Sequence, residues 1–236
     1  MVSLPSISPA RSKLASAAAV LAGLTFNNWL LGPFLNARLF GADGSISEFS
    51  VRGQPDFWVF RGLDIAAGLL LIGLAYLLKD ALKGRRYGQL LLIATAALGL
   101  ANVADALAPL SCSETLDGAC KIAVRLSHGY SVPAHAYSSV AVAICYFLLP
   151  LSGLLFGRAI KSRFLTLSSG LLVILALYSF VSAVVNYIRI SSLTVRTSGA
   201  GQEVQMLLLG LWLAAFYSYF ALRQLAHKAV KNDGPG

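Results

Sequence analysis

The segment that decides the fold runs from Phe57 to Leu78 and reads FWVFRGLDIAAGLLLIGLAYLL. A helix needs about 20 mostly apolar residues to cross the hydrocarbon core of a bilayer, which is about 30 Å thick. The segment does not alternate apolar and polar residues, as a strand of a membrane barrel would. Because a chain in lipid must satisfy its own backbone hydrogen bonds, this segment predicts a membrane-spanning α-helix.

The composition of the whole chain extends this prediction beyond one helix. Hydrophobic residues make up 57% of the 236 residues, charged residues only 12%, and the mean hydropathy is +0.71. Soluble domains are about one quarter charged, so a soluble globule of this size could not bury the apolar surface of this chain. The composition excludes a cytosolic enzyme, a secreted disulfide scaffold and a nucleic-acid-binding protein.

Further apolar segments of this kind predict an all-α fold, a single membrane domain over residues 1–236 that forms a bundle of six transmembrane helices. The predicted helices cover about 14–35, 57–78, 87–107, 133–156, 164–188 and 204–225, and the loops 36–56, 108–132 and 189–203 lie between them on one side of the membrane. The apolar part of the first helix is longer than that of a signal peptide. We therefore expect an uncleaved anchor helix at the start of the chain.

The distribution of charge predicts the orientation of this bundle. The terminal segments and the short loops 79–86 and 157–163 hold most of the lysine and arginine, whereas the opposite side holds most of the acidic residues. Basic loops stay on the cytoplasmic side of a membrane. We expect a multi-pass protein of the cell (inner or plasma) membrane with both termini cytoplasmic, and the net charge of +9 then reflects topology and attraction to anionic lipid.

The three cysteines fall in two environments. Cys112 and Cys120 share the predicted outer loop 108–132, whereas Cys145 lies inside the fourth predicted helix. An outer compartment permits oxidation, so the first two predict a disulfide that staples the loop. Their spacing is not the CxxC of a thiol-exchange enzyme, and we interpret Cys145 as a small core residue.

Ionisable and amide side chains gather near the outer ends of the predicted helices. Such groups are costly in lipid and indicate function by default. Arg61 and Asp64 lie three residues apart on one face of a helix, where they could pair with each other or belong to an internal polar site. The hypothesis of an outward-facing ligand pocket includes Arg61, Asp64, Asn102, Asp105, His128, His135, Asn186 and Glu203. Asn27 and Asn28, inside the first predicted helix, are interpreted as interhelical hydrogen-bonding groups.

A metal site is an alternative use of part of this set. His128, His135 and Asp105 could ligate zinc, although neither HExxH nor another tight ligand pair occurs in the chain. No cofactor is predicted, and zinc is kept as an alternative.

Three stretches carry a family resemblance: SEFSVRGQPDFWVFRGLDIAAGLLL at 47–71, NVADALAPLSCSETLDGAC at 102–120 and SHGYSVPAHAYSS at 127–139. Over roughly residues 20–225 the chain resembles the prokaryotic family named domain of unknown function 998. More loosely, it is similar to eukaryotic six-span proteins of the damage-regulated autophagy modulator and GPI-anchor-remodelling type. The first resemblance implies a small polytopic membrane protein and the second implies lipid-associated roles, but neither implies an activity.

Several functions follow from these observations as alternatives. In the first, the protein binds or handles a lipid or amphiphile, with Asp64, Asp105, His128 and His135 facing the headgroup and Arg61 or Arg125 facing a phosphate. In the second, it is a metal-dependent membrane hydrolase. In the third, it is a non-catalytic scaffold for another membrane protein or a homo-oligomer, and a proton-coupled transporter is a further alternative. Membrane lipids are the expected partners, and nucleic acid is not.

Overall fold

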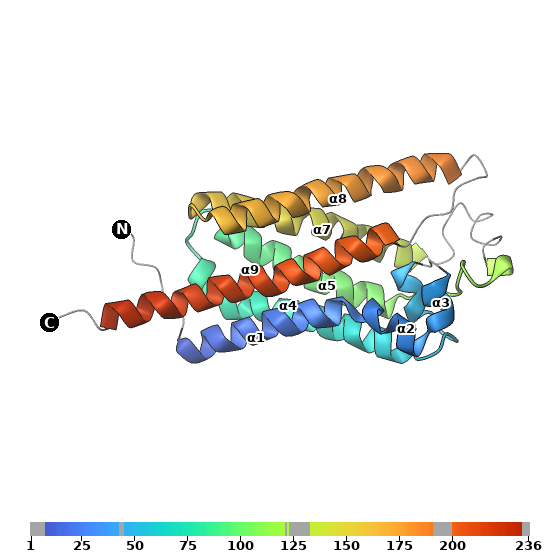
Figure 1. Ribbon diagram of the computed structural model, residues 1–236, viewed down its shortest axis with the longest axis horizontal. Coiled ribbons are helices and arrows are strands. Elements are labelled where there is room, and N and C mark those ends of the chain that lie inside the picture. Colours follow the sequence, from blue (N-terminus) through green and yellow to red (C-terminus); the bar gives the residue numbers. More distant parts are fainter. Residues whose placement is uncertain (1–7, 43–44, 121, 123–132, 191–199, 233–236) are drawn as a thin grey trace.

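The computed structural model describes residues 8–42, 45–120, 122, 133–190 and 200–232, with side chains described in these ranges except at 133, 179–180, 182–190, 200–201 and 223–232. All regular secondary structure in these ranges is helical. The six long helices are α1 (Pro9–Phe26), α4 (Phe57–Leu82), α5 (Gly88–Leu107), α7 (Pro133–Ala159), α8 (Arg163–Ile190) and α9 (Ala200–Asn232). They run along the long axis of the molecule (Figure 1).

The long helices form a closed ring in chain order. Each one packs against the next, and α9 packs against both α8 and α1. The first residues of α1 and the last residues of α9 lie at the same end of the bundle (Figure 1). We call the opposite end, which carries Cys112 and Cys120, the disulfide end. At the end that holds the start of α1, Arg11 ties α1 to α4 through an ion pair with Asp80, with a distance of 2.6 Å from Nη1 to Oδ2.

Four short helices lie between α1 and α4 and gather at the disulfide end (Figure 1). They are η1 (Asn28–Leu31), α2 (Gly32–Leu35), α3 (Ala37–Gly41) and η2 (Ile46–Ser50). The last two lie inside the segment 36–56 that was predicted as a loop. In its described parts, 36–42 and 45–56, this segment is therefore a structured cap on the bundle.

The prediction of one continuous helix over 14–35 is wrong. Helix α1 ends at Phe26, and the segment from Asn28 to Leu35 is bent from it by 55°. Asn27 marks the break, because its side-chain amide donates to the carbonyl oxygen of Gly23 at 2.9 Å. Pro33 has no N–H group, and its ring would clash with a carbonyl one turn earlier in a continuous helix. It lies instead in the first turn of a new helix, α2, which begins at Gly32.

The other predicted segments are helical, and all have longer bounds than the sequence indicated except 87–107, which begins one residue later at Gly88. Four helices are long and apolar enough to cross a membrane, and the bent pair Pro9–Phe26 plus Asn28–Leu35 makes a fifth if it counts as one span. In α8 the stretch Arg163–Tyr178 is apolar but shorter. The described part of the chain thus has four or five candidate spans, as expected of a multi-pass membrane protein. The sixth span and the cytoplasmic side of the termini stay predictions.

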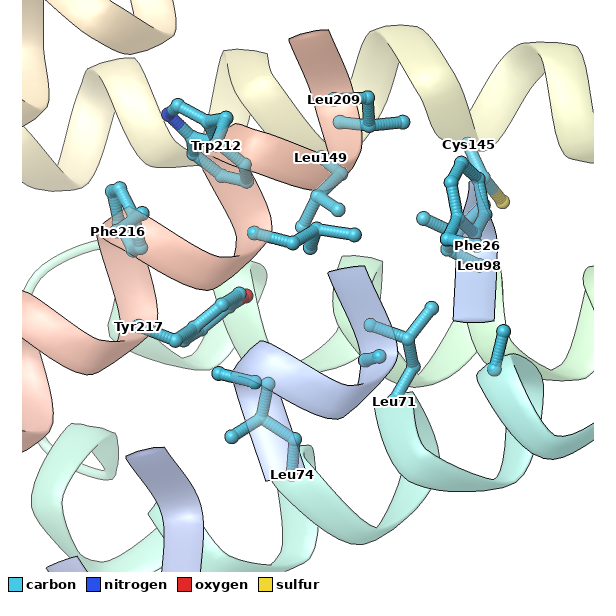
Figure 2. Packing of buried hydrophobic residues seen from close by; sticks show 14 of the residues in the cluster. Phe26, Leu71, Leu74, Leu98, Cys145, Leu149, Leu209, Trp212, Phe216 and Tyr217 are labelled. Carbon is cyan, nitrogen blue, oxygen red and sulfur yellow. The ribbon is translucent and has the colours of Figure 1, made fainter. Parts of the chain in front are cut away.

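Buried apolar side chains from all six long helices form one cluster inside the ring. Figure 2 shows Phe26 of α1, Leu71 of α4, Leu98 of α5, Leu149 of α7 and Trp212 of α9 converging on one cluster. Cys145 of α7 belongs to the same cluster and is a free, buried thiol. This confirms its interpretation as a core residue.

Candidate functional site

The Arg61 side chain lies against the cap and not against Asp64. Its Nη2 donates to the backbone carbonyl of Ser50 at 3.0 Å, and its guanidinium lies 5.3 Å from the centre of the Phe57 ring. Its Nε is buried and has no hydrogen-bond partner. Of the two arrangements that the sequence left open, pairing between Arg61 and Asp64 does not occur, because the described arginine ion pair joins Arg11 to Asp80.

Asp64 joins three elements at the disulfide end. Its Oδ1 accepts a hydrogen bond from Asn28 Nδ2 of η1 at 2.5 Å, and its Oδ2 accepts one from Ser50 Oγ of η2 at 3.3 Å. Asn28 also donates to the carbonyl oxygen of Phe60 at 3.3 Å. The carboxylate thus fixes the bent start of the chain and the cap to α4. Asn28 makes the interhelical contacts expected of it, whereas Asn27 bonds within its own helix.

Helix α5 brings a second carboxylate to the same region. Asn102 Nδ2 donates to the backbone carbonyl of Asp64 at 2.7 Å. Asp105 lies three residues later, on the same helix face. The carboxylates of Asp64 and Asp105 are close enough to interact electrostatically.

Asp105 is the centre of a compact group contributed by α5 and α7. Its Oδ1 accepts hydrogen bonds from Ser138 Oγ at 2.7 Å and from Ser139 Oγ at 2.8 Å. His135 Nδ1 lies 3.5 Å from the same oxygen and 2.9 Å from the carbonyl oxygen of Ala108. His135 Nε2 lies 3.3 Å from Ser139 Oγ. We call Asp105, His135, Ser138 and Ser139 the Asp105 group.

The predicted pocket residues are therefore partly assembled. Arg61, Asp64, Asn102, Asp105 and His135 come together at the disulfide end. His128 lies outside the described residues, and Asn186 is in α8 with its side chain outside them.

Glu203 lies in the first turn of α9. The side chain next to it, Gln202, accepts a hydrogen bond from the backbone N–H of Ile46 through Oε1 at 3.3 Å. The start of α9 is thereby held against the cap. Glu203 thus follows a residue that contacts the cap, and its place in a ligand pocket stays a prediction.

Sequence reasoning missed Glu48, which is 4% exposed. Glu48 connects the cap to the loop that contains Cys112 and Cys120, which we call the disulfide loop. It accepts hydrogen bonds from the backbone N–H and Oγ1 of Thr115 at 3.1 and 2.8 Å, from Ser113 Oγ and from the backbone N–H of Ser45 at 3.3 Å. A signal was present, because Ser45 and Glu48 form the S-x-x-E pattern of a capping box. Ser138 and Ser139 were also missed, although they follow His135 at helical spacing.

The predicted disulfide between Cys112 and Cys120 is confirmed, with Cα atoms 6.0 Å apart. When the protein is made in an oxidising compartment, we expect Cys112→Ser to lower the free energy of unfolding by about 2–3 kcal/mol, because the cross-link restricts the unfolded chain. Intrinsic tryptophan fluorescence during heating measures the change. Wild type and variant prepared fully reduced should unfold at the same temperature, and an equal loss there contradicts this account.

The structure brings together only some of the candidate zinc ligands. Two of its three ligands, Asp105 and His135, lie together, but within the described ranges no group of three His, Cys, Asp or Glu side chains could hold a metal ion. The third ligand, His128, is outside those ranges. His135 could offer a metal only Nε2, since Nδ1 faces a carbonyl oxygen.

Comparison with known proteins places the chain in a family without assigning an activity. No curated protein and no solved structure matches it. The family described as "Protein of unknown function (DUF998)" matches residues 15–219, which is most of the chain and includes the described site residues. Because this match covers most of the chain, the protein belongs to the DUF998 family.

Proposed function

We propose that the protein binds the phosphate-bearing headgroup of a lipid or amphiphile at the disulfide end, in the outer leaflet of the membrane. The observation that carries this proposal is a pair of arginines. Arg52 is exposed, and its charge lies close enough to Arg61 for the two to repel each other. Among the described residues neither arginine forms an ion pair. An anion between them would relieve that repulsion.

The unpartnered Nε of Arg61 favours phosphate over a simple counter-ion. A guanidinium offers several N–H donors in a fixed plane, which match the oxygens of a phosphate. Two of the groups that hold Arg61, the Ser50 carbonyl and the Phe57 ring, orient that plane. The guanidinium thus keeps N–H donor capacity that the described residues do not use.

The surroundings of the pair favour a ligand that arrives from the bilayer. Exposed apolar and aromatic side chains flank the polar residues at this end: Phe34 is 84% exposed, Trp58 66%, Leu107 68% and Tyr137 78%. Tryptophan and tyrosine concentrate where the hydrocarbon core meets the headgroups. A lipid could thus place its chains on these side chains and its headgroup on the arginines.

Replacing Arg61 tests this proposal. We expect Arg61→Ala to weaken binding of phosphatidylglycerol by about tenfold or more, because a hydrogen bond to a charged group contributes about 1.5–3 kcal/mol. Titration of the detergent-purified protein with phosphatidylglycerol, followed by the fluorescence of the tryptophans, measures the affinity. Trp58, one helical turn before Arg61, is the expected reporter.

Arg38→Ala is the matched control, because Arg38 is an exposed arginine of α3 at the same end. It should change the affinity by less than twofold. Equal losses in both variants would show that only overall charge matters, and an unchanged affinity in Arg61→Ala would remove the site. Phosphatidylcholine and free inorganic phosphate, titrated in parallel, separate an anionic lipid from a neutral lipid and from a soluble ion.

A further inference from the structure

The Asp105 group contains a serine, a histidine and an aspartate in contact. Ser139 and His135 are four residues apart on α7, so they share one face of the helix. The hydroxyl of Ser139 lies 3.3 Å from His135 Nε2. The other ring nitrogen lies 3.5 Å from Asp105 Oδ1. A serine nucleophile, a histidine base and an aspartate that orients the histidine are the constituents of a hydrolytic triad.

The hydrogen bonds fix the protonation of the histidine. The carbonyl oxygen of Ala108 can only accept, so His135 Nδ1, at 2.9 Å from it, carries the proton. In the neutral ring Nε2 then has a lone pair directed at Ser139. This is the tautomer in which a histidine can take a proton from a hydroxyl. Asp105 is placed to stabilise the imidazolium that forms.

Ser138 leaves Ser139 free for this role. Both hydroxyls reach Asp105 Oδ1, at 2.7 and 2.8 Å. Each hydroxyl has one proton, so Ser139 either donates to Asp105 Oδ1 or turns its proton to His135 Nε2. In the second case Ser138 still donates to Asp105 Oδ1. Among the side chains that the structure describes, Ser139 is the one that contacts Nε2. The second acceptor of Ser138 is the backbone carbonyl oxygen of His135.

The group lies where a substrate in the membrane could reach it. His135 is 8% exposed, and Ser139 is half-buried. The neighbouring Tyr137 and Val140 are 78% and 56% exposed. The serine hydroxyl is thus near the lipid-facing surface, while the imidazole is kept away from water.

We infer that Ser139 is a nucleophile that cleaves an acyl ester, with His135 as general base and Asp105 as its partner. The ester's identity as a lipid rests on the headgroup site proposed above, whereas the nucleophile rests only on the Asp105 group. Oγ of Ser139 forms a bond to the acyl carbon as its proton moves to His135 Nε2. The bond from that carbon to the ester oxygen breaks, and the alcohol leaves with the proton from Nε2. Water then attacks the acyl-serine, giving one proton to His135, which returns it to Ser139 as the fatty acid departs.

Labelling with an alkyl fluorophosphonate tests this inference on the full-length protein in detergent. This probe bonds covalently to activated serines. We expect one adduct per chain, located on Ser139 by peptide mass spectrometry, and none in Ser139→Ala. General-base assistance contributes on the order of 10²–10⁴-fold, so His135→Gln should slow labelling by at least about 100-fold.

Two further serines of α7 provide contrasts. Ser138→Ala should slow labelling by less than about tenfold, because it removes a contact to Asp105 but none to Nε2. Ser152, which is buried and bonded to the carbonyl oxygen of Leu149, should give an alanine variant that labels like the wild type. If Ser139→Ala does not fold, Ser139→Cys should lose the fluorophosphonate adduct and gain an iodoacetamide adduct at the same position.

An unlabelled wild type with its disulfide formed, or an adduct that survives in Ser139→Ala, would overturn the inference. The probe carries no anionic headgroup, so labelling does not depend on Arg52 and Arg61. Labelling without phosphatidylglycerol binding would keep the nucleophile and remove the proposed headgroup site. Binding without labelling would do the reverse.

Discussion

Gly68→Ala should lower the free energy of unfolding by about 1–3 kcal/mol, the usual range for overpacking a core. A Cβ at Gly68 would lie 2.6 Å from the carbonyl oxygen of Gly99 and 2.6 Å from Val103 Cγ2. A Cβ at Gly99 would in turn lie 2.6 Å from the carbonyl oxygen of Gly68. The backbones of α4 and α5 cross here in direct contact, and a backbone oxygen cannot rotate away. The two helices must separate to accommodate the methyl group.

Gly73→Ala is the matched control on the same helix, because a Cβ there would meet no atom within 4 Å. Alanine favours a helix over glycine, so this variant should be neutral or slightly stabilised. A thiol-reactive fluorophore during heating measures both, since Cys145 is a buried free thiol and the other two cysteines are disulfide-bonded. Equal unfolding temperatures for the two variants would contradict close packing at Gly68.

The second large effect is expected at Glu48. We expect Glu48→Gln to destabilise the disulfide end by about 2–4 kcal/mol, because hydrogen bonds to a charged group are strong and leaving buried partners unpaired is costly. The partners of this carboxylate all donate: they are Ser45, Ser113 and Thr115. An amide of the same size would replace one accepting oxygen with an NH₂ group that faces donors. The exchange therefore tests charge and acceptor number without removing volume.

Asp80→Asn serves as the comparison for Glu48→Gln. Its carboxylate pairs with Arg11 but is 52% exposed, and exposed ion pairs contribute about 1 kcal/mol or less. Hydrogen exchange of the backbone amides, with the unfolding temperature, shows where stability is lost. In Glu48→Gln we expect faster exchange confined to the cap and the disulfide loop. A fall in unfolding temperature no larger than that of Asp80→Asn would contradict the role of Glu48 in holding the two together.

The Glu48 contacts also matter for the proposed function. Glu48 and Ser50 belong to the same short helix, η2, and Ser50 contacts both Asp64 and Arg61. Loosening η2 should therefore weaken phosphatidylglycerol binding even though Glu48 does not contact the headgroup. The site depends on a cap whose position is fixed by a buried carboxylate.

Some parts of the site could be read from the sequence. The spacing of Asn102 and Asp105 placed both on one face of α5, and an outer cysteine pair with loop spacing predicted the disulfide. These inferences depend on the geometry of one helix or one loop. Arg61 and Asp64 show the limit, because helical spacing allowed them to pair but their partners are Ser50, Phe57 and Asn28 instead. The rotation and the packing of several elements select among such partners.

Residue patterns alone were enough to predict a helical chain with several membrane spans, because a long apolar run in lipid can satisfy its backbone only within itself. It also located where polar groups interrupt these runs. Three features became visible only once the helices were packed together. The first predicted span is bent after Phe26, Glu48 holds the loop that contains Cys112 and Cys120, and Ser139, His135 and Asp105 meet. Those contacts join residues up to tens of positions apart, and they depend on how helices rotate and cross, which local residue patterns do not encode.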